Sequence, residues 1–230
     1  MKPQSKNSKK KILIIVENLP LPFDRRVWQE ATTLKEAGFI VSVICPVGKG
    51  YETKYENLQG INIYRHPLPT EGSCLSNYFF EYSSALFWEF ILSLKVFRNH
   101  GFDIIQACNP PDTIFMIGLF YKLFFQKKFV FDHHDINPEL YEAKFGRRDL
   151  FYKILFLFEW LTFKTADMSI ATNESYKKIA VCRGKMPPDK VHVVRSAPCL
   201  DRMKIVQPNL KWKNGRQYMI GYLGVMGKQE

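Results

Sequence analysis

One segment of the chain carries more information about the fold than any other, namely residues 128–141, which read KFVFDHHDINPELY. Residues 129–131 are a short apolar run, typical of a strand buried on both faces of a parallel sheet. Four titratable side chains follow in residues 132–135, where such a strand would leave its sheet. Open α/β sheets bind ligands beyond the carboxyl ends of their strands. We therefore expect a binding or proton-transfer site here; alternatively, one histidine packs in the core and the aspartates cap the next helix.

The rest of the chain alternates between strand-like runs and longer amphipathic stretches. Strands are expected at residues 12–16, 41–45, 61–65, 103–108, 129–132, 168–172 and 191–195. Helices are expected at residues 26–37, 76–99, 113–125, 149–165 and 174–183. This alternation predicts an α/β fold, a Rossmann-like doubly wound parallel sheet with helices on both faces. Pro138 is expected to prevent a regular helical face between Asp135 and Glu139.

The sequence changes character near its end. Residues 206–217 are irregular, and residues 218–230 begin a fresh strand that runs into Gly224 and Gly227, a pattern that opens nucleotide-binding βα units. We therefore divide the chain into a basic flexible tail (1–11), a Rossmann-like domain (12–205), a linker (206–217) and the start of a second domain (218–230). Alternatively, the last strand adds to the edge of the first sheet.

The composition restricts the compartment and the partners. With 33 Lys and Arg against 22 Asp and Glu, the net charge of +11 favours a polyanionic neighbour: nucleic acid, anionic lipid or a phosphorylated substrate. The five cysteines are scattered without a C-x-x-C pair, which indicates reduced thiols and neither disulfides nor a zinc site. No signal peptide and no apolar run of roughly 18 residues is present. We expect a cytoplasmic protein, either free or peripheral at the inner face of the cell membrane.

Two segments rich in aromatic residues bear on the membrane question. Residues 78–98 are heavily apolar for a surface helix, and residues 120–129 interleave aromatics with lysines. Such helices can lie in the interface of an anionic membrane, or their aromatics can simply pack between helix and sheet. Basic and aromatic residues also occur together in binders of single-stranded nucleic acid. No RRM, KH, helix-turn-helix or zinc pattern accompanies them, so we expect no nucleic-acid partner.

Six segments, taken in order, match a known family. They are FDRRVWQEA at residues 23–31, FDHHDINPELY at 131–141, AD at 166–167, ATNESY at 171–176, VVRSAP at 193–198 and GYLGVMGKQE at 221–230. Together they resemble the bacterial family-4 (group 1) glycosyltransferases of GT-B type. The resemblance covers nearly the whole chain from Lys11 onward. It implies the N-terminal, acceptor-binding domain of such an enzyme, followed by the first strand and loop of the donor-binding domain.

The resemblance also implies an activity. It implies that a sugar, of hexosyl type, passes from a nucleotide-sugar donor to a saccharide or lipid-linked acceptor in cell-surface polysaccharide synthesis, with retention of configuration. The nucleotide sugar is a co-substrate, so no cofactor and no obligatory metal are expected. The donor-binding carboxylates that the family carries later have no counterpart here, and we expect the chain to be inactive alone. The alternative is a non-catalytic module, left by a natural truncation, that binds an acceptor or a partner subunit.

By resemblance, His134 and Asp135 are the catalytic candidates. His134 occupies the position whose imidazole approaches the donor sugar and stabilises developing charge, which suits a group that donates hydrogen bonds near pH 7. Asp132 and Asp135 are candidates for holding its orientation. Adjacent strand residues point in opposite directions, so His133 is expected to face away from His134, towards the core.

The remaining candidates bind phosphates or substrate. Asp24, Arg25 and Arg26 open the first helix, where two arginines can clamp a phosphate; alternatively, Asp24 only caps a solvated helix start. By resemblance, further substrate-binding positions are Asn173, Glu174 and Arg195. The family's diphosphate loop matches Gly224, Gly227 and Lys228.

Overall fold

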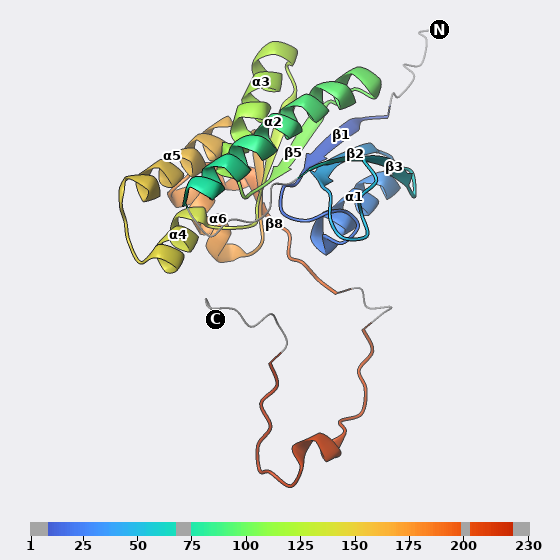
Figure 1. Ribbon diagram of the computed structural model, residues 1–230, viewed down its shortest axis with the longest axis vertical. Helices are drawn as coiled ribbons and strands as arrows, with labels where there is room; N and C mark the ends of the chain where they lie inside the picture. The colour runs from blue at the N-terminus through green and yellow to red at the C-terminus, as the bar shows by residue number, and fades with distance from the viewer. Residues whose placement is uncertain (1–8, 68–74, 199–202, 223–230) are drawn as a thin grey trace.

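The protein is built around one eight-stranded sheet. The computed structural model describes residues 9–67, 75–198 and 203–222 (Figure 1). Its strands are β1 (Lys11–Ile15), β2 (Ile40–Pro46), β3 (Tyr55–Leu58), β4 (Ile61–His66), β5 (Ile104–Cys108), β6 (Lys128–His133), β7 (Met168–Ala171) and β8 (Val191–Val193). The strand order is β3-β4-β2-β1-β5-β6-β7-β8, and in the described part only the β3–β4 pair is antiparallel. The prediction of a Rossmann-like parallel sheet is confirmed.

Helices cover both faces of the sheet. They are α1 (Arg25–Glu36), α2 (Leu75–Asn99), α3 (Phe115–Phe125), α4 (Asn137–Phe145), α5 (Leu150–Thr165) and α6 (Glu174–Cys182), with short 3-10 turns η1 (Asp112–Ile114), η2 (Pro188–Lys190) and η3 (Leu210–Lys213). Alternate residues of β1 supply the two halves of the core. Leu13 and Ile15 belong to the half that α2, α3, α5 and α6 cover, whereas Ile12 and Ile14 belong to the half that α1 covers.

The order in which the chain visits the strands indicates where the sheet binds ligands. From β1 the chain proceeds outward through β2 and β4, then returns across α2 to β5 on the other side of β1 and continues to β6, β7 and β8. Ligands of doubly wound sheets bind where the strand order reverses, outside the carboxyl ends of the strands. That point lies between β1 and β5 (Figure 1).

Two elements were not predicted. The hairpin of β3 and β4 turns at Gln59 and Gly60, which both have positive φ, 51° and 83°. A two-residue turn of this type usually carries Asn-Gly or Asp-Gly. Because Gln59 takes the first position here, the sequence lacked the usual pattern of a hairpin turn. Helix α4 was missed because Pro138 was expected to break a helix. Pro138 instead lies in the first helical turn, where its missing N–H is no loss; the expectation about Pro138 is therefore corrected.

The C-terminal segment also differs from the prediction. The described residues 203–222 extend away from the sheet (Figure 1) and are largely exposed, with Ile220 96 % accessible. Residues 218–222 form no strand, because a lone strand has no partner for its backbone hydrogen bonds. Nor do they add to β8 at the sheet edge. Gly224, Gly227 and Lys228 lie outside the described residues.

None of the helices in the described part of the chain combines the length and the apolarity that crossing a membrane requires.

Candidate active site

The alternation of side chains along β6 determines which of its residues face the site. Phe129, Phe131 and His133 point into the half of the core beneath α5, while Asp132 points to the side that carries α1. Asp132 is completely buried. A buried carboxylate is costly unless charges and hydrogen bonds compensate it, and the surrounding residues are arranged to do so.

Arg26, in the first turn of α1, is the main partner of this carboxylate. Its Nη2 donates to Asp132 Oδ1 at 2.9 Å. Its Nη1 donates to the carbonyl oxygen of Val194 at 2.8 Å and to Ser196 Oγ at 3.3 Å. Its Nε lies 3.2 Å from Glu30 Oε1, one helical turn further along. One guanidinium therefore joins α1, the end of β6 and the segment after β8.

His134 is the second partner of Asp132. Its Nε2 lies 2.8 Å from Asp132 Oδ2 and also 2.9 Å from Arg26 Nε. One ring nitrogen cannot donate and accept at once; since the buried carboxylate of Asp132 needs a donor, we assign the proton to Nε2. Burial alone would lower the pKa of His134, but the hydrogen bond and charge of Asp132 raise it above the ordinary value.

The same interactions act on Asp132. Burial raises the pKa of this carboxyl, but the hydrogen bond and charge of His134, together with Arg26, outweigh it and bring the pKa to about 2. Asp132 is therefore an anion that orients Arg26 and His134. It is not a proton donor at neutral pH.

Glu30 and Gln106 complete the cluster. Gln106 Nε2 donates to Glu30 Oε2 at 2.6 Å and lies 3.4 Å from Asp132 Oδ2. Burial and the charge of Asp132 raise the pKa of Glu30 to about 8, so this carboxyl is neutral at pH 7. Neither Glu30 nor Gln106 was predicted from the sequence as a site residue. The signals were a polar Gln106 inside the apolar strand IIQAC and a Glu30 four residues after Arg26 on the same helix face.

Asn109, after β5, fixes the loop that carries His134. Its Oδ1 accepts from the backbone N–H groups of His134 at 2.8 Å and Asp135 at 3.2 Å, and its Nδ2 donates to the carbonyl oxygen of Asp135 at 2.6 Å. The side-chain carboxylate of Asp135 forms no hydrogen bond or salt bridge within the described chain, and burial raises its pKa. Asp132 therefore orients His134, and Asp135 does not.

His133 lies on the opposite side of β6, in the core. Its ring is completely buried and packs between those of Phe131, Phe163 and Tyr176, at centroid distances of 5.0–5.4 Å. Burial and the charge of Arg183 lower the pKa of His133 to about 3, so this imidazole is neutral. The pKa values of two adjacent histidines thus shift in opposite directions because the strand alternation places them in different surroundings.

The start of α1 does not form the expected phosphate clamp. Asp24 caps the helix by accepting from the backbone N–H of Val27 at 3.0 Å, which is the alternative that the sequence left open. Arg25 is exposed, but Arg26 is committed to Asp132, Glu30 and Val194. Two arginines cannot clamp one phosphate when one of them is held in a buried ion pair, so this expectation is corrected.

Three further candidates lie along the same edge of the sheet. Asn173 caps α6 by accepting from the backbone N–H of Tyr176 at 3.0 Å, and Glu174 is exposed in the first turn of that helix. Arg195 follows β8 and is also exposed. They follow the carboxyl ends of β7 and β8, next to β6 in the sheet, but none makes a described contact with His134.

Three of the buried groups have the donor types of a metal site. The ligand atoms of Cys108, Asp132 and His134 lie within 4.8 Å of one another. The guanidinium of Arg26 already neutralises Asp132 there, and burial raises the pKa of the Cys108 thiol well above its ordinary range. A protonated thiol beside an existing cation does not fit a divalent metal.

Comparison with known proteins decides the family. Residues 24–197 match the sequence profile of Glycosyltransferase Family 4. The chain belongs to this family. The match confirms the resemblance drawn from the six segments. No curated protein matches the chain in sequence.

Solved structures show the same fold in glycosyltransferases. Sucrose-phosphate synthase from Thermosynechococcus elongatus has a TM-score of 0.65 at 14 % identity, over 84 % of this chain and 49 % of that one. UGT2 of Phytolacca americana, complexed with UDP-2fluoro-glucose and pterostilbene, has a TM-score of 0.53 at 13 % identity, over 90 % and 57 %. The chain thus spans about half the length of these proteins, with the fold of one half of a GT-B glycosyltransferase.

Replacing Arg26 with methionine should strongly destabilise the fold. It leaves the buried carboxylate of Asp132 without its main cation, and breaking a buried ion pair costs about 3–5 kcal/mol. Arg25→Met is the matched control, because Arg25 is exposed next door; it should change the free energy of unfolding by less than about 0.5 kcal/mol. Urea unfolding of both variants measures the difference. Equal effects would show that the Arg26 cluster does not hold the fold.

Replacing Glu30 with glutamine should change how stability depends on pH. The folded pKa of about 8 exceeds the ordinary value of 4.5, so between these values the folded chain keeps a proton that the unfolded chain has released. The stability from this group is therefore complete below about pH 4.5 and lost as the pH rises to about 8. The Glu30→Gln variant does not lose this stability, because the glutamine side chain does not titrate.

The unfolding free energy of Glu30→Gln relative to the native chain should rise by on the order of 2–4 kcal/mol between pH 5 and pH 9. Urea titrations at the two pH values measure it. A difference that stays constant with pH would mean that Glu30 titrates normally.

Proposed function

We propose that the protein is the acceptor-binding half of a glycosyltransferase that moves a sugar from a nucleotide-sugar donor to an acceptor. The observation that supports this most directly is His134, an imidazole whose pKa Asp132 raises and which Asp132 and Asn109 fix at the edge where such folds bind ligands. Membership of family 4 supplies the reaction class.

The proposed role of His134 follows from which of its atoms are free. Asp132 holds Nε2, whereas Nδ1 has no hydrogen-bond partner among the described residues. The side chain is 17 % exposed, so Nδ1 is the atom left to face a substrate. A fixed N–H donor that carries positive charge stabilises an oxygen that gains negative charge during transfer, without reorganising at the moment of reaction.

The charges of the cluster favour an anionic ligand. Asp132 is negative, Arg26 is positive and Glu30 is neutral at pH 7, and the hydrogen bond and charge of Asp132 raise the pKa of His134. Protonation of this imidazole gives the site an excess positive charge. A sugar diphosphate or a phosphorylated acceptor suits that excess. We further propose, from the family resemblance, that transfer retains the anomeric configuration, uses a hexose donor and needs no obligatory metal.

We also propose that the acceptor is lipid-linked, that the enzyme serves surface polysaccharide synthesis, and that it works in the cytoplasm at an anionic membrane. The segment of residues 120–129 supports this only in part, because Tyr121 and Phe129 are core residues. Leu123 and Phe124 of α3, however, are 67 % and 71 % exposed, and the Lys128 side chain nearby in sequence is 70 % exposed. Exposed apolar side chains with lysines beside them fit a lipid interface.

Residues 1–230 alone should show no sugar transfer. Holding donor and acceptor together in a reactive geometry can supply roughly 7–11 kcal/mol of the barrier, and the proposed donor-binding half is not part of these residues. The measurement is release of nucleoside diphosphate from UDP-glucose and other nucleotide sugars by the purified chain. Turnover that survives repurification would contradict the division into two halves.

In an enzyme completed by a donor-binding half, His134→Ala should lower kcat by about 10²–10⁴-fold with little change in KM for the acceptor. His134 directly follows β6 and belongs to neither half of the hydrophobic core, so its truncation leaves no core cavity. His133→Ala is the control: it opens a cavity in the core and should lower stability while the folded fraction keeps its turnover. If His134→Ala keeps native turnover, His134 is not the catalytic residue of the transfer.

A further inference from the structure

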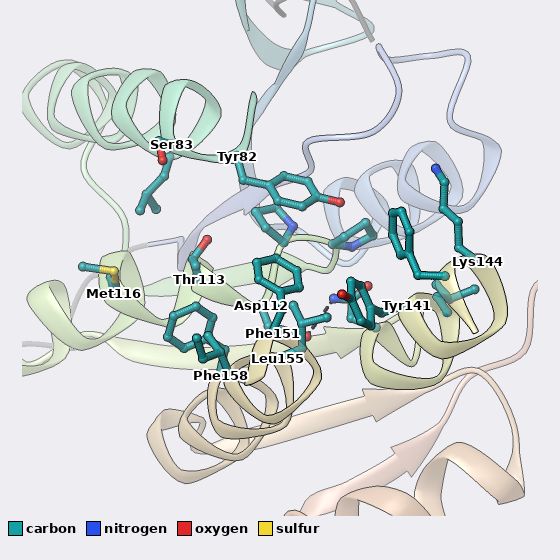
Figure 2. Close-up of a pocket in the computed structure, with 17 residues that line it drawn as sticks. Tyr82, Ser83, Asp112, Thr113, Met116, Tyr141, Lys144, Phe151, Leu155 and Phe158 are labelled. Atoms are coloured by element: carbon teal, nitrogen blue, oxygen red, sulfur yellow. Dashed lines mark hydrogen bonds between the residues drawn. The ribbon is translucent and has the colours of Figure 1, made fainter. Parts of the chain in front are cut away.

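A cavity of about 450 Å³ lies between α2, α4, α5 and η1 (Figure 2). Its volume falls within the roughly 300–1,000 Å³ of small-molecule sites. Most of its wall is apolar, with Leu86 from α2, Met116 from α3 and Phe151, Leu155 and Phe158 from α5. Nothing in the chemistry at His134 requires such a cavity.

The cavity is elongated and reaches the surface. Figure 2 shows Met116 and Phe158 at one end and Tyr141 and Lys144 at the other. Met116 is 53 % exposed and Leu140 is 45 % exposed, although both line the cavity. An open, elongated apolar space suits a chain-like ligand better than a compact polar one such as a sugar.

A hydrogen-bond network connects this cavity to the His134 loop. Asp112 in the cavity wall accepts from Asn109 Nδ2 at 2.9 Å and from Asn137 Nδ2 at 2.7 Å. Asn109 also accepts from the backbone N–H of His134. Asn137 lines the cavity only three residues after His134, so their Cα atoms are at most about 11 Å apart.

We propose that this cavity binds the hydrocarbon chain of the acceptor, with the phosphate that ends the chain placed at the loop of residues 134–137. The assignment rests on the proposed acceptor-binding function. Two features select this occupant. The apolar wall fits a single long chain, and Asn137 in that wall lies three residues after His134, so an anionic head at the end of the chain would lie near the loop that carries His134.

Alkyl phosphates of increasing length, kept below their micelle concentrations, test this with the 230-residue chain itself. Isothermal titration calorimetry should show binding that tightens about fourfold with each added methylene until the cavity is full, and then stops tightening. Inorganic phosphate should bind far more weakly. Affinity that is independent of chain length, or equal for inorganic phosphate, would overturn the proposal.

Two variants on α3 separate the cavity from general surface adsorption. Met116→Asp places a charge at the rim of the cavity and should weaken hexadecyl phosphate binding at least tenfold. Leu119→Asp is the matched control, since Leu119 is exposed on the same helix but does not line the cavity; it should leave this binding unchanged. Equal losses in both variants would mean that the ligand only coats the surface.

A last comparison identifies the kind of chain and keeps this proposal distinct from the proposed function. Tighter binding of geranylgeranyl phosphate than of hexadecyl phosphate indicates an isoprenoid acceptor, and the reverse indicates an acyl chain; both support the cavity assignment. Chain binding without sugar transfer in a completed enzyme would refute the function and leave the cavity site intact. Sugar transfer to a lipid acceptor that is unaffected by Met116→Asp would refute the cavity site alone.

Discussion

The buried carboxylate of Asp132 is the constraint on which the rest of this edge depends. It has no access to water, so its charge persists only because Arg26 and His134 both contact it. Arg26 in turn ties α1 to the backbone after β8, which lies on the far side of β7 in the sheet. The position of His134 is thus a consequence of how the fold compensates one charge.

The same cluster decides which groups are charged. The hydrogen bond and charge of Asp132 raise the pKa of His134, and burial together with the charge of Asp132 raises the pKa of Glu30. In both cases the protonated form is favoured, which is a cation for the imidazole and neutral for the carboxyl. A protonated His134 therefore gives the site a net positive charge, although acids and bases are equally numerous in it. It reaches this state without the pair of arginines that the sequence suggested.

The sequence predicted most of the sheet because parallel strands buried on both faces are continuous apolar runs, as in KILII of β1 and FVF within β6. It also separated His133 from His134, since that difference depends only on strand alternation. It could not show that Arg26 meets Asp132, 106 residues away, or that Gln106 reaches Glu30. Those contacts depend on strand order, which no local pattern contains.

Asn109 is the residue that connects the two sides of β6. The charged cluster lies on the side of α1, and the apolar cavity lies on the side of α5. Asn109 follows β5, next to β6, and uses both atoms of its amide: Oδ1 fixes the loop of His134, and Nδ2 contacts Asp112 in the cavity wall. Burial raises the pKa of Asp112 to about 7, so this carboxyl carries less negative charge near neutral pH than an ordinary aspartate does. A ligand that fills the cavity would contact Asp112, which accepts a hydrogen bond from the same amide that positions the imidazole, so Asn109 connects the cavity wall to the loop of His134.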